Sequence, residues 1–99
     1  MKKLMKQASE MQRKMEDAQE KLKDIIVESS VGGGMVKVKM NCRMDVLDIE
    51  IGDEIIKAEE KDVLKDLLIS GVNEAKRKAE ETAQNEISKV TGGMNLPGF

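Results

Sequence analysis

The sequence has no histidine, a single cysteine and one aromatic residue, with neither Trp nor Tyr. Without His it lacks the commonest general base and the commonest metal ligand, which excludes the usual Ser-His and Cys-His nucleophilic sites. One Cys excludes an intrachain disulfide and a CxxC zinc site, and it is typical of a reducing compartment. Cys42 lies in a predicted turn without a second thiol or a base, so we interpret it as structural. We therefore predict that the protein is not an enzyme and has no catalytic residue, metal, cofactor or small-molecule substrate.

Long apolar runs and large apolar side chains are also scarce. No stretch approaches the roughly 18 apolar residues of a membrane span, and polar residues interrupt the start too early for a secretory signal. We expect a cytoplasmic protein without membrane contact. Apolar residues are 39% of the 99 residues and include eight Met. With so few bulky side chains, either the core is aliphatic and extended or a second chain completes it.

Charged residues make up 36% of the chain, and their distribution is more informative than the net charge of −2. Residues 1–23 carry a net +3, residues 24–60 carry a net −5, and residues 61–99 are neutral. The net charge alone does not indicate a nucleic-acid-binding protein. A partner would nevertheless meet a basic amino end and an acidic middle.

The first 23 residues predict a helix with an apolar stripe. The members of the stripe recur at intervals of 4, 3, 4, 3 and 4 and are Leu4, Ala8, Met11, Met15, Ala18 and Leu22. This heptad spacing is typical of a helix that packs along a narrow seam. It fits a helix packed on its own chain and an intermolecular coiled coil, and the two can coexist.

Residues 25–51 predict two or three antiparallel strands. Apolar side chains alternate with Lys over 35–40 and with acidic residues over 47–51, which gives each strand one apolar and one solvated face. The glycine triplet at 32–34 lacks the Lys-Ser/Thr of a phosphate loop and opens no helix, so we interpret it as a hairpin turn. The acidic segment 53–60 is predicted to be irregular. The carboxylates over 45–60 lack calcium-loop spacing, so we interpret them as a solvated acidic rim.

A second long helix is predicted over 61–90. Its first half has an apolar face broad enough to cover a sheet, formed by Leu64, Leu67, Leu68 and Val72. The face then narrows to residues at four- or three-residue spacing, namely Ala75, Ala79, Ala83, Ile87 and Val90. Gly92-Gly93 is expected to end this helix, and 91–99 forms a tail.

The predicted architecture is therefore a single α+β domain over 1–99, in the order α-β-β-β-α. A three-stranded antiparallel meander is flanked by two long helices. Both helices are longer than such a small sheet can cover, so we expect part of each to project.

Three segments of this chain carry a resemblance to a known family. They are Leu4-Met5-Lys6-Gln7-Ala8 with Met11-Gln12, Gly34-Met35-Val36-Lys37-Val38, and Gly92-Gly93-Met94-Asn95-Leu96-Pro97-Gly98-Phe99. In these segments the chain resembles the YbaB/EbfC family of bacterial nucleoid-associated proteins. The resemblance implies a homodimer joined through the sheet region, with helices that project like tweezer arms. It also implies duplex DNA binding with little sequence preference, in the nucleoid.

The candidate DNA contacts are Lys2, Lys3, Lys6, Arg13, Lys14, Arg77 and Lys78. The first three begin a helix, where cations oppose the macrodipole, so a polyanionic partner would explain them; the alternative is a frayed, solvated terminus. Glu10 precedes Lys14 by four residues and favours an ion pair there. On a helix the side chains of residues 76–78 point in directions about 100° apart from one to the next, so they cannot share one phosphate track. We favour a solvated face there and keep Arg77 and Lys78 as secondary candidates.

Two hypotheses about function remain open. The first is a dimeric protein that binds duplex DNA through phosphate contacts with low sequence specificity and helps to organise the nucleoid. The scarcity of aromatics argues against single strands, which bind by base stacking. The alternative is a dimeric adaptor that binds a protein through its projecting helices and acidic middle. The net charge favours the adaptor, whereas the resemblance and the basic helix start favour DNA.

Overall fold

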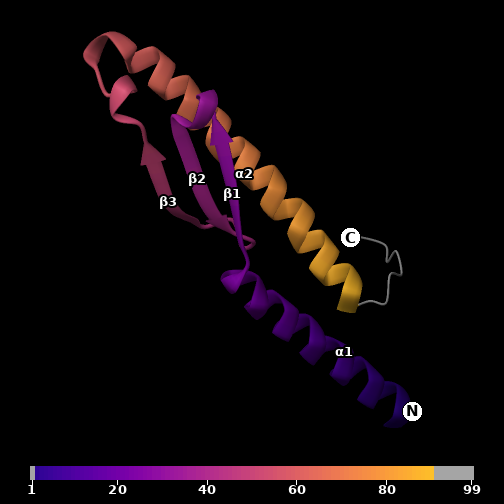
Figure 1. The fold of residues 1–99 in the computed structure, drawn as a ribbon. Helices are drawn as coiled ribbons and strands as arrows, with labels where there is room; N and C mark the ends of the chain where they lie inside the picture. Colours follow the sequence, from indigo (N-terminus) through magenta and orange to yellow (C-terminus); the bar gives the residue numbers. More distant parts are fainter. Residues whose placement is uncertain (1, 91–99) are drawn as a thin grey trace.

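The computed structural model describes residues 2–90 as two long helices and a three-stranded sheet (Figure 1). The helices and strands are α1 (Lys2–Lys21), β1 (Ile26–Val31), β2 (Val36–Asn41), β3 (Val46–Ile51) and α2 (Lys61–Val90). This order confirms the predicted α+β fold with an α-β-β-β-α protomer. The predicted tail at 91–99 and its Gly92-Gly93 cap lie outside the described residues.

Short 3-10 helices occupy the connections between these elements. They are η1 (Leu22–Asp24), η2 (Gly32–Gly34), η3 (Asp53–Ile55) and η4 (Ala58–Glu60). All three glycines of η2 have positive φ angles, of 61°, 66° and 91°, a conformation that side chains with a Cβ rarely adopt. The triplet therefore turns the chain between β1 and β2, as the sequence predicts.

The sheet is an antiparallel meander in the order β1-β2-β3, so β2 is central and the other two strands are edges. On its solvated face, Lys37 pairs across to Glu50 and Lys39 to Asp48. The register between β2 and β3 shifts between Lys39 and Met40. Opposite charges therefore face each other across this surface, an arrangement that stabilises strand pairing.

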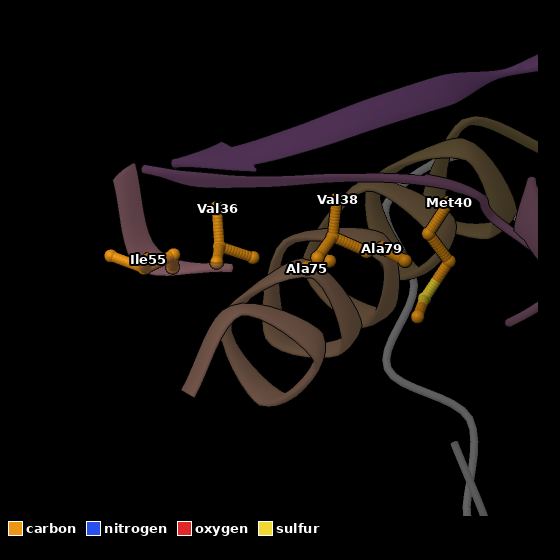
Figure 2. Packing of buried hydrophobic residues seen from close by; sticks show 6 residues of the cluster. All are labelled: Val36, Val38, Met40, Ile55, Ala75 and Ala79. Atoms are coloured by element: carbon orange, nitrogen blue, oxygen red, sulfur yellow. The ribbon is translucent and has the colours of Figure 1, made fainter. Parts of the chain in front are cut away.

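The aliphatic core lies between the other face of the sheet and α2 (Figure 2). Its buried members are Val36, Val38, Met40, Ile55, Ala75 and Ala79. The leucine-rich start of α2 packs against them, which confirms that this helix covers the sheet. A Cβ added to Gly71 would lie 3.1 Å from Val38 Cγ2, and Ser29 Oγ donates a hydrogen bond to the Gly71 carbonyl over 2.6 Å. Small residues thus let α2 approach the strands closely.

Two details differ from the sequence prediction. Ile55 is buried in the core although its segment was predicted to be a solvated rim, because η3 turns this one side chain inward while its acidic neighbours stay exposed. On β3, Leu47 is 50% exposed and Ile49 is also exposed, although the alternation predicts a core-facing side. The register shift leaves Leu47 without a cross-strand partner, whereas Ile49 pairs with Val38 and is exposed at the edge of the sheet.

Within residues 2–90, helix α1 packs on the rest of the molecule only through its C-terminal end. Within the apolar stripe, Ala18 and Leu22 are buried, but Leu4 is 69% exposed. The helix runs antiparallel to α2 and continues past its end (Figure 1). The result is an elongated molecule, 68 Å long and 21 by 16 Å across, in which the first half of α1 projects as an arm.

Candidate nucleic-acid interface

The N-terminal half of α1 holds a dense group of cations. Residues 2–14 include five Lys or Arg and one acidic residue, for a net +4. The cations are Lys2, Lys3, Lys6, Arg13 and Lys14, and all are exposed. Within the described chain none of them has an ion-pair partner inside 4.0 Å or a side-chain hydrogen bond. The ion pairs that Glu10 could form with Lys6 and Lys14 are therefore not made, and these charges face solvent.

Helical geometry gathers these cations on the side of α1 opposite the apolar stripe. At about 100° per residue, Lys2, Lys6 and Arg13 fall within about 40° of one another around the helix. We call these three residues the basic row; it spans roughly 16 Å along the axis and lies about 180° from the centre of the stripe. Lys3 and Lys14 form a second row, about 90° from the basic row around the helix axis. The apolar stripe can thus pack against protein on one side of α1, while the basic row on the opposite side can contact a different partner.

The chemistry of the arm suits an anion. No acidic residue lies in the first turn of α1, so nothing in that turn offsets the positive end of the helix macrodipole. Each cation there costs about 0.3–1 kcal/mol of helix stability when it is well ordered. A polyanion placed against the arm would reverse the sign of this interaction, which favours binding to a phosphate backbone.

The three successive cations at 76–78 of α2 are arranged differently. Every one of the three successive cations has acidic partners on the same helix, with distances of 4.0 Å for Lys76–Glu80, 3.9 Å for Arg77–Glu74, 4.0 Å for Arg77–Glu81 and 3.9 Å for Lys78–Glu74. Lys78 Nζ also donates a hydrogen bond to the Glu28 carbonyl of β1 over 2.9 Å. The secondary candidates Arg77 and Lys78 are therefore partly neutralised, and Lys78 ties α2 to the sheet, a role that no sequence pattern revealed.

A groove of about 600 Å³ separates the base of α1 from the C-terminal end of α2. It is lined by Lys14, Asp17, Ala18, Glu20, Lys21, Asp24, Glu86, Lys89 and Val90. The Lys23 ammonium, 2.8 Å from Glu20, lowers the pKa of that carboxyl. Residues 15–24 carry a net −2, so the positive potential of the arm ends at this groove. Within 2–90, no three His, Cys, Asp or Glu side chains are placed to hold a metal ion.

Cys42 lies where α1 is joined to the sheet. Its backbone N–H donates to the carbonyls of Leu22, over 3.1 Å, and Ile25, over 3.0 Å. The thiol is buried, and burial together with nearby Glu86 raises its pKa. A neutral, inaccessible thiol is a poor nucleophile, which supports the interpretation of Cys42 as structural.

The model of the YbaB/EbfC DNA-binding family matches residues 1–94 of this sequence. The chain belongs to this family. A nucleoid-associated protein of Bordetella avium is 50% identical to this YbaB/EbfC chain over 94 residues, which cover 95% of this chain and 86% of the relative. Another nucleoid-associated protein, from Afipia carboxidovorans, is 44% identical over 96 residues, which cover 97% and 91% of the two chains.

A solved structure has the same architecture as this YbaB/EbfC protein. It is the crystal structure of an uncharacterized protein of Helicobacter pylori, with a TM-score of 0.79 and 30% identity, covering 90% of this chain and 94% of that one. These matches confirm the family resemblance, and the family is described as DNA-binding. The family is named for DNA binding and not for a reaction. Among the helices within 2–90, none is long and apolar enough to cross a membrane.

Proposed function

We propose that this protein is a nucleoid-associated homodimer that binds duplex DNA through phosphate contacts, with little sequence preference. The observation that carries the proposal is the basic row of Lys2, Lys6 and Arg13 on a projecting helix of a DNA-binding family member. These cations are exposed and have no acidic partner among residues 2–90. Lys3 and Lys14 extend the same positive surface. The names of the bacterial relatives favour the nucleoid of the cytoplasm as its location.

The side chains of the arm favour phosphate contact over base readout. Four of the five cations are Lys, a flexible point charge that suits phosphate binding without fixed geometry. The only aromatic residue of the chain is Phe99, so stacking of single-stranded bases has little support. Electrostatic binding of this kind depends on duplex charge and depends little on sequence.

The body of the molecule favours contact at the arm alone. Residues 24–60 carry a net −5, and their acidic turns lie at the far end of the molecule from α1's start (Figure 1). Asp48 and Glu50 lie on the solvated face of the sheet opposite lysines, so this face offers DNA no surplus of positive charge. The duplex is therefore held at the arm and away from the sheet.

The homodimer is proposed on the exposed edge of the sheet. Three large apolar residues of β3 are exposed, namely Val46, Leu47 and Ile49. An unpaired edge strand with apolar side chains is a template for a second chain, whereas β1 exposes only Ile26 among its large apolar residues. We therefore place the dimer contact at β3. Light scattering at micromolar concentration should give twice the 11.0 kDa chain mass, and a well-folded monomer would contradict this part of the proposal.

A salt titration of duplex binding tests the function. If each protomer makes about two phosphate contacts, roughly four counterions are released, and log K falls with log salt at a slope of about −3 to −4. The triple variant Lys2→Gln, Lys3→Gln, Lys6→Gln should flatten that slope and weaken binding equally on unrelated duplexes. The matched control is Lys76→Gln, Arg77→Gln, Lys78→Gln, which removes the same charge from α2 and should leave the slope nearly unchanged.

Two outcomes would overturn the proposal in different ways. If the wild-type dimer binds no duplex at low salt, the adaptor function is favoured, which the net charge of −2 and the exposed part of the apolar stripe would then explain. If the triple variant at Lys2, Lys3 and Lys6 binds unchanged, the start of the arm is not the site. The site then moves to Arg13, Lys14, Arg77 and Lys78, and the α2 control variant should weaken binding.

A further inference from the structure

The basic row is part of a longer row of polar residues on the same side of α1. The members of this polar row recur at intervals of 4, 3, 4, 3 and 4 and are Lys2, Lys6, Ser9, Arg13, Glu16 and Glu20. At about 100° per residue, they fall within about 80° of one another around the helix. The polar row therefore repeats with the same spacing as the apolar stripe on the opposite side.

The charge of the polar row changes sign after Arg13. The next member is Glu16, which lies only about 4.5 Å further along the helix axis. That separation is shorter than the Debye length of about 8 Å at physiological salt, so the Glu16 carboxylate repels phosphate from this part of α1. Phosphate contact on this side of the helix is therefore restricted to the four members from Lys2 to Arg13.

Ser9 is the uncharged member of these four. It is exposed and lies in the longest interval of the basic row, about 10.5 Å between Lys6 and Arg13. It is also the only residue of α1 with a hydroxyl group. Serine within a helix can donate to the carbonyl four residues earlier, but among residues 2–90 the Ser9 hydroxyl has no hydrogen-bond partner. The hydroxyl is therefore free to donate to a bound molecule.

The small size of Ser9 supports the same conclusion. Its short side chain lies between two long cationic side chains, Lys6 and Arg13, and leaves room for a phosphate group to approach the helix between them. Serine hydroxyls are among the common donors to phosphate oxygens in protein–DNA complexes. The alternative is a surface serine that contacts only water, and the two cases predict different effects on DNA affinity.

We propose that Ser9 donates a hydrogen bond to a DNA phosphate held between Lys6 and Arg13. This inference rests on the proposed function and deepens it, because it adds a neutral contact to a surface otherwise described by charge. A neutral contact contributes to affinity without releasing a counterion. Its loss should therefore be separable from the loss of a lysine in a salt titration.

Two substitutions of Ser9 test the hydroxyl. Ser9→Ala should weaken duplex binding about threefold or more and leave the slope of log K against log salt unchanged. Ser9→Thr keeps the hydroxyl and should bind within twofold of the wild type. The matched control is Gln12→Ala, which removes a neutral polar side chain about 100° from the basic row and should change affinity less than 1.5-fold.

A second pair of variants tests the position of the phosphate. Ser9→Glu places a carboxylate at the proposed contact and should weaken binding at least tenfold. Gln12→Glu adds the same charge on another side of α1 and should weaken binding less than threefold. Circular dichroism of both variants should show unchanged helix content, so that the comparison reports binding.

The outcomes separate this inference from the proposed function. Equal affinity of Ser9→Ala and the wild type, or equal losses in the two Glu variants, would overturn the role of Ser9 while the basic row remains the DNA site. If the wild type binds no duplex at low salt, the proposed function fails and the role of Ser9 fails with it.

Discussion

Helix α1 carries five cations in residues 2–14 that have no ion-pair partner among the described residues. Helix α2 carries four in residues 76–89, and each has an acidic partner on the same helix at 4.0 Å or less. Counting Lys and Arg would rank the two helices alike. Both helices have carboxylates three or four residues from their cations, and what separates them is whether ion pairs form. This difference explains why a cluster of three successive cations on α2 is a weaker DNA candidate than scattered cations on α1.

The same contrast holds for small residues. Ala75 and Ala79 of α2 are fully buried against the sheet, whereas Ala8 of α1 is exposed. The first helix is therefore a projecting arm with a free surface, and the second is a structural support. Substitutions at equivalent residue types should therefore affect stability much more in α2 than in α1.

The largest effect is expected from a charge placed in the core. Ala75→Asp would bury a carboxylate with no partner and should lower the free energy of unfolding by more than about 3 kcal/mol. Ala8→Asp, on the exposed part of α1, should lower it by less than about 1 kcal/mol. Urea unfolding monitored by circular dichroism measures both, and similar losses would mean that the two helices are equally buried in solution.

A smaller effect is expected at the closest approach of α2 to the sheet. A Cβ added at Gly71 would lie 3.1 Å from Val38 Cγ2, so Gly71→Val should destabilise the fold by about 2–3 kcal/mol through overpacking. Gln7→Val on α1 is the control, because it should cost only the difference in helix propensity, about 0.5 kcal/mol. Thermal unfolding of the pair tests whether the close approach exists in solution.

A third pair separates binding from stability. Lys78→Gln loses the hydrogen bond to the Glu28 carbonyl, so it should lower the free energy of unfolding by about 0.5–1.5 kcal/mol and barely change DNA affinity. Lys6→Gln should weaken DNA binding and leave stability nearly unchanged, because Lys6 is exposed and makes no ion pair or side-chain hydrogen bond among the described residues. The opposite pattern would assign the DNA contact to α2.

The smallest effect concerns pH. Since burial raises the pKa of the Cys42 thiol, the unfolded chain loses this proton first as the pH rises. The contribution of the thiol to stability is therefore complete below about pH 8.5 and is lost as the pH rises through its folded pKa. Cys42→Ser should remove this part of the alkaline decline, with dimer mass and DNA binding unchanged. Loss of DNA binding in the folded variant would show that Cys42 is more than structural.

Most of the fold could be predicted because each element has its own residue spacing. Apolar residues recur at helical spacing in α1 and α2 and alternate along β2, and Val36, Val38 and Met40 are buried as that alternation requires. Ile55 escaped the prediction because acidic neighbours mask a single inward-facing side chain. The exposure of Leu47 escaped it too, since alternation identifies an apolar face but does not reveal whether another element covers it.

The candidate site is predicted less completely than the fold. The basic start of α1 is visible in the sequence, and the structure adds that its cations have no ion-pair partner in the described part of the chain. Local spacing also placed acids four residues from Arg77 and Lys78. The contact between Lys78 and the Glu28 carbonyl joins residues 50 positions apart, and no local pattern encodes such a contact. A four-residue spacing does not guarantee an ion pair either. Glu10 lies four residues from Lys6, yet no ion pair joins them among the described residues.

The length of the molecule has a consequence for the way it meets DNA. At 0.1 M salt the field of a charge decays over about 10 Å, whereas this protein is 68 Å long. Its positive and negative regions lie near opposite ends, so the molecule has a large electric dipole along its axis. As it diffuses toward a duplex, only the leading end feels the field, and the torque on the dipole turns the arm forward. Encounters should therefore be oriented before contact, and added salt should slow association by removing this alignment.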